Sequence, residues 1–171
     1  RVEAAKAGEA RREGHLRPLG FIGDGEMGLN PGGNPIRVAV VAWSWGKYLG
    51  EEGQERGIRA KVSSFSRHFV NAKMTKGKTC GDYVNSILAK REALLDGYDE
   101  AILLDAHGLV SEASGENVFL VSAGVLRTPP LYSVLGGITR ASVIEIARDR
   151  GIPVEEAPIT RDELYIADEL F

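Results

Sequence analysis

Two lysines that precede a helix-like repeat are the residues of this sequence best placed for nucleophilic chemistry. Lys76 and Lys78 lie just before residues 81–96, where apolar side chains recur at helical spacing. A lysine whose charge is disfavoured by burial and by the positive end of a helix dipole supplies the neutral amine that Schiff-base chemistry needs. We interpret Lys78 as a candidate amine, although lysines before a helix are more often solvated surface groups.

Two carboxylates lie in a segment of small residues that leads into an apolar strand. Glu112 and Glu116 are four positions apart within residues 110–119. A carboxylate held at such a place can protonate a heterocycle nitrogen and keep it cationic. A polar hairpin explains the same pattern equally well.

A glycine pair before a second predicted helix is a candidate phosphate site. Gly136 and Gly137 let the backbone approach a ligand closely, and the helix expected over residues 139–150 starts with free N–H groups. The positive end of the helix dipole and the Thr139 hydroxyl would both favour a phosphate. The spacing is not that of a Walker loop, and the alternative is an ordinary tight turn with Thr139 as the N-cap.

The composition excludes several classes of protein. The net charge is −3 and the pI about 5.7, which argues against nucleic acid as the main partner. The longest unbroken apolar run, residues 38–43, is too short to cross a bilayer, so we expect no membrane partner. The single cysteine, Cys80, excludes an internal disulfide. The histidines show no metal-ligand spacing, so we expect no metal site.

The succession of elements predicts the fold class. Helices are expected over residues 81–96 with a stop at Gly97, over 139–150 with a stop at Gly151, and over 161–168 with Thr160 as cap. Strands are expected over residues 16–22 with an interruption at Pro18, 36–43 as a buried strand, 58–64, 101–105, 117–121, 125–128 and 152–156. Strands first form hairpins and then alternate with helices, which predicts an α+β fold with a mixed sheet and outer helices.

The helix over residues 81–96 has the clearest pattern in the sequence. Its residues at helical offsets 0, 3, 4, 7 and 11, the pattern of an amphipathic helix, are Val84, Ile87, Leu88, Arg91 and Leu95. An opening helix is also expected from Val2 to Arg12, because that segment is rich in Ala, Glu, Lys and Arg.

Five parts of the chain, in this order, resemble the fold-type IV pyridoxal-phosphate enzymes, and most closely the branched-chain amino acid aminotransferases. They are residues 16–19 with 28–31, 45–50, 78–86, 111–119 and 137–140. The resemblance covers essentially the whole chain, and five parts in register are a stronger signal than any one alone. It implies the mixed-sheet pseudo-barrel with outer helices of that family's large domain, with pyridoxal 5′-phosphate as the cofactor.

The resemblance implies roles for residues at the cofactor. Lys78 would form the Schiff base and shuttle a proton, and Tyr83 would hydrogen-bond the phenolic oxygen of the ring. Glu112 would pair with the ring nitrogen, with Glu116 as the next candidate. Ile138 and Thr139 would donate backbone N–H groups to the phosphate, and Leu135 would lie beside the ring.

The resemblance also implies a substrate pocket lined by Arg17 and Tyr48, which would help to recognise glutamate. Three residues depart from the family pattern, one at this pocket and two next to Lys78. His15 stands where the family often has a tyrosine, and Cys80 and Asp82 replace residues that are more usually small or amide.

The implied activity is transamination of branched-chain L-amino acids with 2-oxoglutarate, by a cytoplasmic homodimer or higher homo-oligomer whose partners are amino acids and 2-oxo acids. The alternatives are a D-amino-acid or amine transaminase or an aminodeoxychorismate lyase of the same fold, and a catalytically inactive fragment. We expect residues 1–14 to end the connection from a small N-terminal domain and residues 15–171 to form the cofactor-binding large domain. Because the chain starts at Arg1 and stops at Phe171, we also expect it to be a segment of a longer protein.

Overall fold

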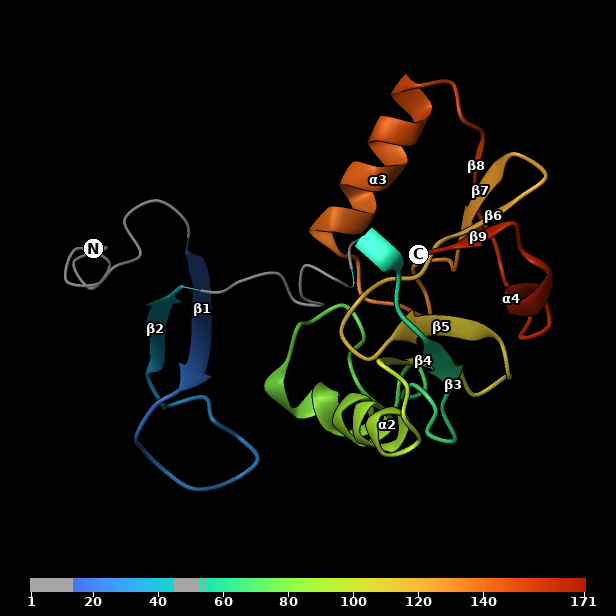
Figure 1. Cartoon of the computed structure of the whole chain (residues 1–171). Coiled ribbons are helices and arrows are strands. Elements are labelled where there is room, and N and C mark those ends of the chain that lie inside the picture. The colour runs from blue at the N-terminus through green and yellow to red at the C-terminus, as the bar shows by residue number, and fades with distance from the viewer. Residues whose placement is uncertain (1–13, 45–52, 54) are drawn as a thin grey trace. The chain divides into compact units, whose positions relative to one another are not determined.

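The computed structural model of the chain describes residues 14–44, 53 and 55–171. It contains two units, Arg1–Gly57 and Ile58–Phe171, which are considered separately (Figure 1). The opening helix predicted from Val2 lies outside the described residues. All of the residues predicted to contact the cofactor belong to the second unit.

The first unit contains a two-stranded antiparallel ribbon. Strand β1 (His15–Ile22) pairs with β2 (Ile36–Trp43) along its whole length, and Pro18 lies opposite Val40. The predicted interruption at Pro18 is therefore wrong, because a strand with one neighbour has an open edge where no N–H is needed. The predicted burial of β2 is also wrong within this chain, since Ile36 is 80% exposed.

The second unit is built on two mixed sheets. The strands of the first, in spatial order, are β3 (Ala60–Val62), β4 (Glu100–Leu104) and β5 (Val110–Ala113). A tight turn over residues 105–108 joins β4 to β5. The Asp105 carboxylate accepts the backbone N–H groups of His107 and Leu109, and Gly108 has a φ of +81°. This hairpin directs β5, which carries Glu112.

Helix α2 (Val84–Leu95) follows a 3-10 turn, η2 (Cys80–Tyr83), and packs against β4 (Figure 1). The contact is made by Ala89 and Ala93, which are fully buried. Methyl side chains let the helix backbone approach the sheet closely, so α2 packs on the sheet through its small residues. The large apolar residues of the amphipathic pattern are exposed in this chain, at Val84, Ile87, Leu88 and Leu95.

The second sheet has the order β8, β7, β6, β9. Its strands are β6 (Leu120–Ser122), β7 (Val125–Thr128), β8 (Val154–Glu156) and β9 (Glu169–Leu170). Helix α3 (Ile138–Asp149) connects β7 to the parallel strand β8 and packs on the sheet through Ile144 and Ala147. It ends before Gly151, as predicted, and this glycine has a φ of +70°.

A common apolar core joins the two sheets. Its buried residues are Ile102, Val110, Ala113, Val118, Leu120 and Ile159. The last helix, α4 (Glu163–Ile166), adds Leu164 to this core. It is shorter than predicted and begins after Asp162, so Thr160 is not its cap.

Both sheets of the second unit combine parallel and antiparallel pairs, and a helix packs on each. This arrangement confirms the predicted mixed-sheet class. Among the described residues, no helix combines the length and the apolar character needed to cross a membrane.

The Glu92 carboxylate of α2 is hydrogen-bonded to the residues that follow β3. From these bonds we predict that the protein loses stability in acid. It accepts the Ser63 hydroxyl at 2.5 Å and the Ser64 N–H at 3.0 Å, and these bonds lower the pKa of Glu92 from 4.5 to about 2. A carboxyl with a lowered folded pKa contributes stability that is lost as the pH falls through that pKa. Urea unfolding should therefore show stability falling between pH 4.5 and about 2, and Glu92→Gln should lose less over that window. The same pH dependence in both proteins would refute this assignment.

Candidate functional site

The Glu112 carboxylate on β5 is almost entirely buried, and each of its oxygens has a different partner. The residue is 8% exposed. Oε1 lies 2.6 Å from Nε of Arg67, and Oε2 accepts the backbone N–H of Leu135 at 2.9 Å. Leu135 lies just before α3. A single side chain of β5 therefore fixes the turn at the start of that helix.

Burial raises the pKa of Glu112 above its ordinary value, because a carboxylate loses solvation there. Three contacts oppose this rise: in decreasing order, the charge of Arg67, the N–H of Leu135 and the charge of Lys78. Burial outweighs all three. Because the charge of Lys78 lowers the pKa of Glu112, the electrostatic field of the predicted amine reaches the predicted acid.

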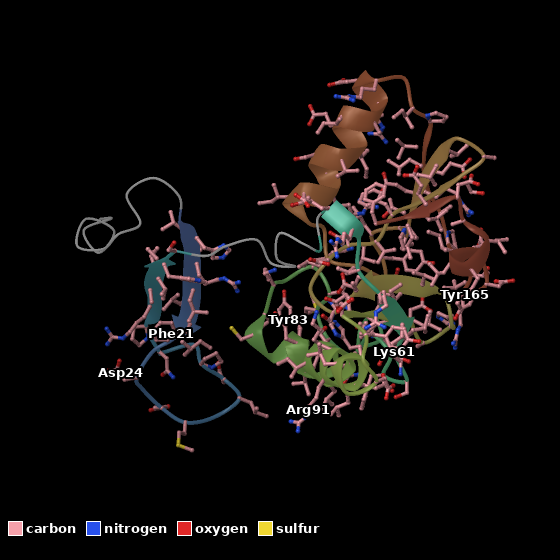
Figure 2. The ribbon with its side chains drawn as sticks, in the orientation of Figure 1. Phe21, Asp24, Lys61, Tyr83, Arg91 and Tyr165 are labelled. Atoms are coloured by element: carbon pink, nitrogen blue, oxygen red, sulfur yellow. The ribbon has the colours of Figure 1, made fainter. Side chains whose placement is uncertain are left out.

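Lys78 lies just before the short turn η2, and Tyr83 is the last residue of that turn. The Lys78 Nζ lies 5.5 Å from the centroid of the Tyr83 ring, within cation–π range. Figure 2 shows Tyr83 beside the first turn of α2. The Lys78 side chain is exposed, so its predicted burial is wrong. Lys76 is engaged elsewhere, because its Nζ donates to the backbone carbonyl of Leu131.

The start of α3 offers backbone donors. Its N-cap is Gly137, and no side chain caps it. Thr139 is the second helical residue rather than the N-cap, so the tight-turn alternative is wrong on this point. Ile138 is 88% exposed, and Thr139 is also exposed. The first N–H groups of an α-helix have no partner within the helix, so this end can bind an anion.

The turn before α3 fits closely against Asn117. The Asn117 Nδ2 donates to the Leu135 carbonyl at 2.9 Å. A Cβ on Gly137 would lie 2.2 Å from the Asn117 Oδ1, which is far inside contact distance. A Cβ on Gly136 would meet only a Leu131 methyl at 3.7 Å. Gly137 is therefore the glycine that this approach requires.

Glu116, the second candidate acid, has different surroundings. Burial and the charge of Glu100 raise its pKa, and Lys90 opposes them. Lys78 acts on Glu112 and not on Glu116. The electrostatics therefore favour Glu112 as the partner of the candidate amine.

Sequence reasoning missed Arg67 and gave Asn117 no individual role. Arg67 lies between β3 and η2, outside every predicted element and outside the five segments that carry the resemblance. Its 7% exposure results from the tertiary packing around it, which no local pattern reveals. Asn117 lies within the recognised segment 111–119, which is the signal that could have found it.

The two predicted substrate-pocket residues stay predictions. Arg17 lies on β1 in the first unit, where it is exposed and pairs with Val41. Tyr48 lies outside the described residues.

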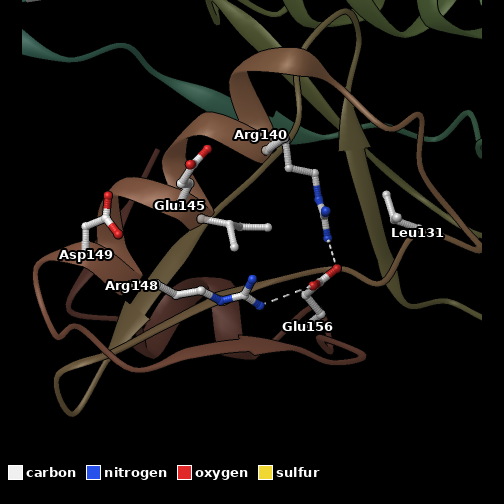
Figure 3. A pocket seen from close by; sticks show the side chains of 8 residues that line it. Leu131, Arg140, Glu145, Arg148, Asp149 and Glu156 are labelled. Atoms are coloured by element: carbon white, nitrogen blue, oxygen red, sulfur yellow. Dashed lines mark hydrogen bonds and ion pairs between the residues drawn. The ribbon is translucent and has the colours of Figure 1, made fainter.

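An open depression of about 430 Å³ runs along α3 (Figure 3). Its charged groups pair with one another: Arg140 lies 2.8 Å from Glu156, and Arg148 lies 3.9 Å from the same carboxylate. The lining consists of Leu131, Arg140, Ala141, Ile144, Glu145, Arg148, Asp149 and Glu156. Neither Lys78 nor Glu112 is among these residues, so we assign the candidate site to the Glu112 region instead.

Residues 2–171 match the family described as amino-transferase class IV. The branched-chain-amino-acid aminotransferase of Pseudomonas aeruginosa is 48% identical over 157 residues, which are 92% of this chain and 51% of that protein. The chain thus spans about half the length of the curated relatives it matches.

Two solved structures show the same fold. The branched-chain aminotransferase of Thermoproteus uzoniensis, solved with norvaline, has a TM-score of 0.91 at 46% identity, and the match covers 99% of this chain and 56% of that one. The branched-chain amino acid aminotransferase of Thermobaculum terrenum, solved in its PLP-bound holo form, has a TM-score of 0.87 at 32% identity, with 98% and 54% covered. These similarities confirm the predicted fold-type IV architecture.

The contact between Gly137 and Asn117 predicts a different cost for two neighbouring glycines. Gly137→Ala should destabilise the second unit by about 1–3 kcal/mol, because the added methyl displaces Asn117 from the Leu135 carbonyl. The matched control Gly136→Ala should change the free energy of unfolding by less than about 0.5 kcal/mol. Chemical denaturation measures both. Equal losses in the two variants would show that the close approach is not what requires Gly137.

Proposed function

Because the chain belongs to the class IV aminotransferase family, we propose that the protein carrying it is a pyridoxal 5′-phosphate-dependent aminotransferase that acts on branched-chain L-amino acids with 2-oxoglutarate. The observation that carries this proposal is the Glu112 carboxylate, which is buried, is bonded to the turn before α3 and has its pKa lowered by the charge of Lys78 against the effect of burial. The family supports the reaction type, and the named relatives support the substrate class.

The described residues fit the cofactor at both of its ends. A carboxylate has sites for about four hydrogen bonds, and Glu112 uses one oxygen for Arg67 and the other for Leu135. Lone pairs therefore remain for the N–H of a pyridinium ring. The uncapped, exposed start of α3 offers N–H groups to the phosphate. Because Leu135 binds Glu112, the two ends of the site are held in a fixed arrangement.

Four residues then have defined roles. When bound, pyridoxal 5′-phosphate supplies an electron sink for the substrate Cα. Glu112 keeps the proton on the ring nitrogen, which strengthens that sink. Lys78 attaches the cofactor through Nζ and moves a proton to and from the substrate Cα. Tyr83 donates to the phenolic oxygen of the ring, and Thr139 offers its N–H to the phosphate.

Substrate recognition by Arg17 and Tyr48, and assembly as a cytoplasmic homodimer, complete the proposal. The resemblance of residues 16–19 and 45–50 to the branched-chain enzymes supports the two substrate residues, and membership of the family supports the assembly. Assays that pair 2-oxoglutarate with L-leucine, with D-amino acids and with simple amines separate the proposed reaction from the other activities of this fold.

The two lysines before η2 should differ in cofactor attachment. Borohydride reduction of the loaded protein, followed by peptide mapping, should place the pyridoxyl group on Lys78, because the Lys76 amine is engaged by the Leu131 carbonyl. Lys78→Ala should abolish both label and turnover, and the matched variant Lys76→Ala should keep both. A label found on Lys76 would overturn the assignment.

The two candidate acids should also differ. Glu112→Gln should lower kcat roughly ten- to a hundredfold, because a charged hydrogen bond is worth about 1.5–3 kcal/mol, and it should weaken cofactor binding less. Glu116→Gln should leave kcat close to that of the parent, because Glu116 is influenced by Glu100 and Lys90 rather than by Lys78. Steady-state kinetics with cofactor titration measure both effects. The reverse order would make Glu116 the acid.

A further inference from the structure

A buried arginine forms an ion pair with the Glu112 carboxylate. Arg67 is 7% exposed, and its Nε lies 2.6 Å from the Glu112 Oε1. We propose that Arg67 is a positioning residue that fixes both the orientation and the negative charge of the Glu112 carboxylate, which can then hold the proton of the cofactor's ring nitrogen. This inference rests on the function proposed above for Glu112.

The geometry around Glu112 supports an orienting role. Arg67 approaches one carboxylate oxygen and the Leu135 N–H binds the other, so rotation of the carboxylate would break both contacts. A guanidinium is always charged, and at 2.6 Å the Nε of Arg67 attracts one Glu112 oxygen toward it. The remaining lone pairs of Glu112 then keep a fixed direction.

The charge of Arg67 has a second effect. Burial raises the pKa of Glu112, and Arg67 is the strongest of the contacts that lower it. Without Arg67, only the Leu135 N–H and the more exposed Lys78 would oppose burial. Glu112 would then bind a proton at a higher pH and would lose the negative charge that attracts a pyridinium N–H.

Arg67 is itself held from two sides. Its backbone N–H donates to the Leu104 carbonyl at 2.8 Å, which ties it to the end of β4. Its Nη1 lies 2.8 Å from Nδ1 of His68 and 3.5 Å from the Asp82 carbonyl, next to Tyr83 in η2. Arg67 therefore links Glu112 to the turn that carries Tyr83.

His68 takes part as a neutral acceptor. A guanidinium can only donate, so the Nδ1 of His68 must be unprotonated for this contact to form. Burial and then the Arg67 charge lower the pKa of His68, with Lys73 adding to the effect and Asp82 opposing it. The neutral imidazole can therefore accept a hydrogen bond from Arg67, and it carries no positive charge that would attract the Glu112 carboxylate away from Arg67.

The first test measures the protonation of Glu112 without cofactor. Infrared difference spectra of the complete protein, recorded over a range of pH, give the midpoint at which the Glu112 carboxyl band appears, and Glu112→Gln identifies that band. Arg67→Met should raise this midpoint by about 1–3 pH units, the shift expected from the loss of an adjacent cation. Arg67→Lys should shift it less. The matched control Arg127→Met removes another arginine–carboxylate pair, with Glu163, and should leave the midpoint unchanged.

A second variant keeps the test decisive if Arg67→Met folds poorly. Replacing one member of a buried ion pair leaves the other charge uncompensated, whereas replacing both does not. Arg67→Met combined with Glu112→Gln should therefore recover most of the thermal stability that Arg67→Met loses. An unmoved midpoint in Arg67→Met, or a double variant as unstable as Arg67→Met, would overturn the proposal.

Cofactor binding separates this proposal from the proposed function. Absorbance titration should show pyridoxal 5′-phosphate binding to Arg67→Met roughly tenfold more weakly at neutral pH, as the ring nitrogen loses a charged partner. A shifted Glu112 midpoint with unchanged cofactor affinity would keep the link between Arg67 and Glu112. It would reject Glu112 as the partner of the ring nitrogen.

Discussion

The Glu112 carboxylate is 8% exposed, so charges and hydrogen bonds must replace the solvation that it loses. Several elements of the second unit meet at this residue to supply them. Its two partners come from opposite directions along the chain: Arg67 from the segment after β3, and Leu135 from the turn before α3. The contacts of this one side chain therefore connect the β4–β5 hairpin to the segment before η2 and to the start of α3. These are the elements that carry the proposed amine, acid and phosphate donors.

Polar side chains of the second unit reinforce this arrangement by donating to backbone carbonyls of other segments. Ser111 donates to the Ser133 carbonyl at 2.5 Å, Asn117 to that of Leu135 at 2.9 Å, and Thr128 to that of Val118 at 2.8 Å. Each bond satisfies a carbonyl outside regular secondary structure. The turn before α3 is thus held from several sides before any ligand binds, which limits the ordering that binding must impose.

Local patterns predicted α2, α3 and most strands of the second unit, but they missed β5, which carries Glu112, and the short strand β9. The ends of α2 and α3 follow from Gly97 and Gly151, because a left-handed backbone stops a helix whatever surrounds it. The same patterns failed for burial. The large apolar residues of α2 are exposed, and the helix packs through Ala89 and Ala93, because the sheet accepts the face that can approach most closely. The exposed strand β2 failed for a related reason, since an apolar run does not specify how many neighbours a strand has.

The sequence by itself determined the type of most elements and the ends of α2 and α3 before Gly97 and Gly151. Through the order of its segments it also gave the resemblance that singled out Lys78, Tyr83 and Glu112. The tertiary structure added physical grounds for choosing Glu112 over Glu116 and Lys78 over Lys76. Only the tertiary structure distinguished Gly137 from Gly136 and revealed Arg67. Backbone preferences act over a few residues and can be read locally. Desolvation and ion pairing depend on which distant segment covers a group, and that is decided when the β4–β5 hairpin, η2 and α3 come together around a single buried charge.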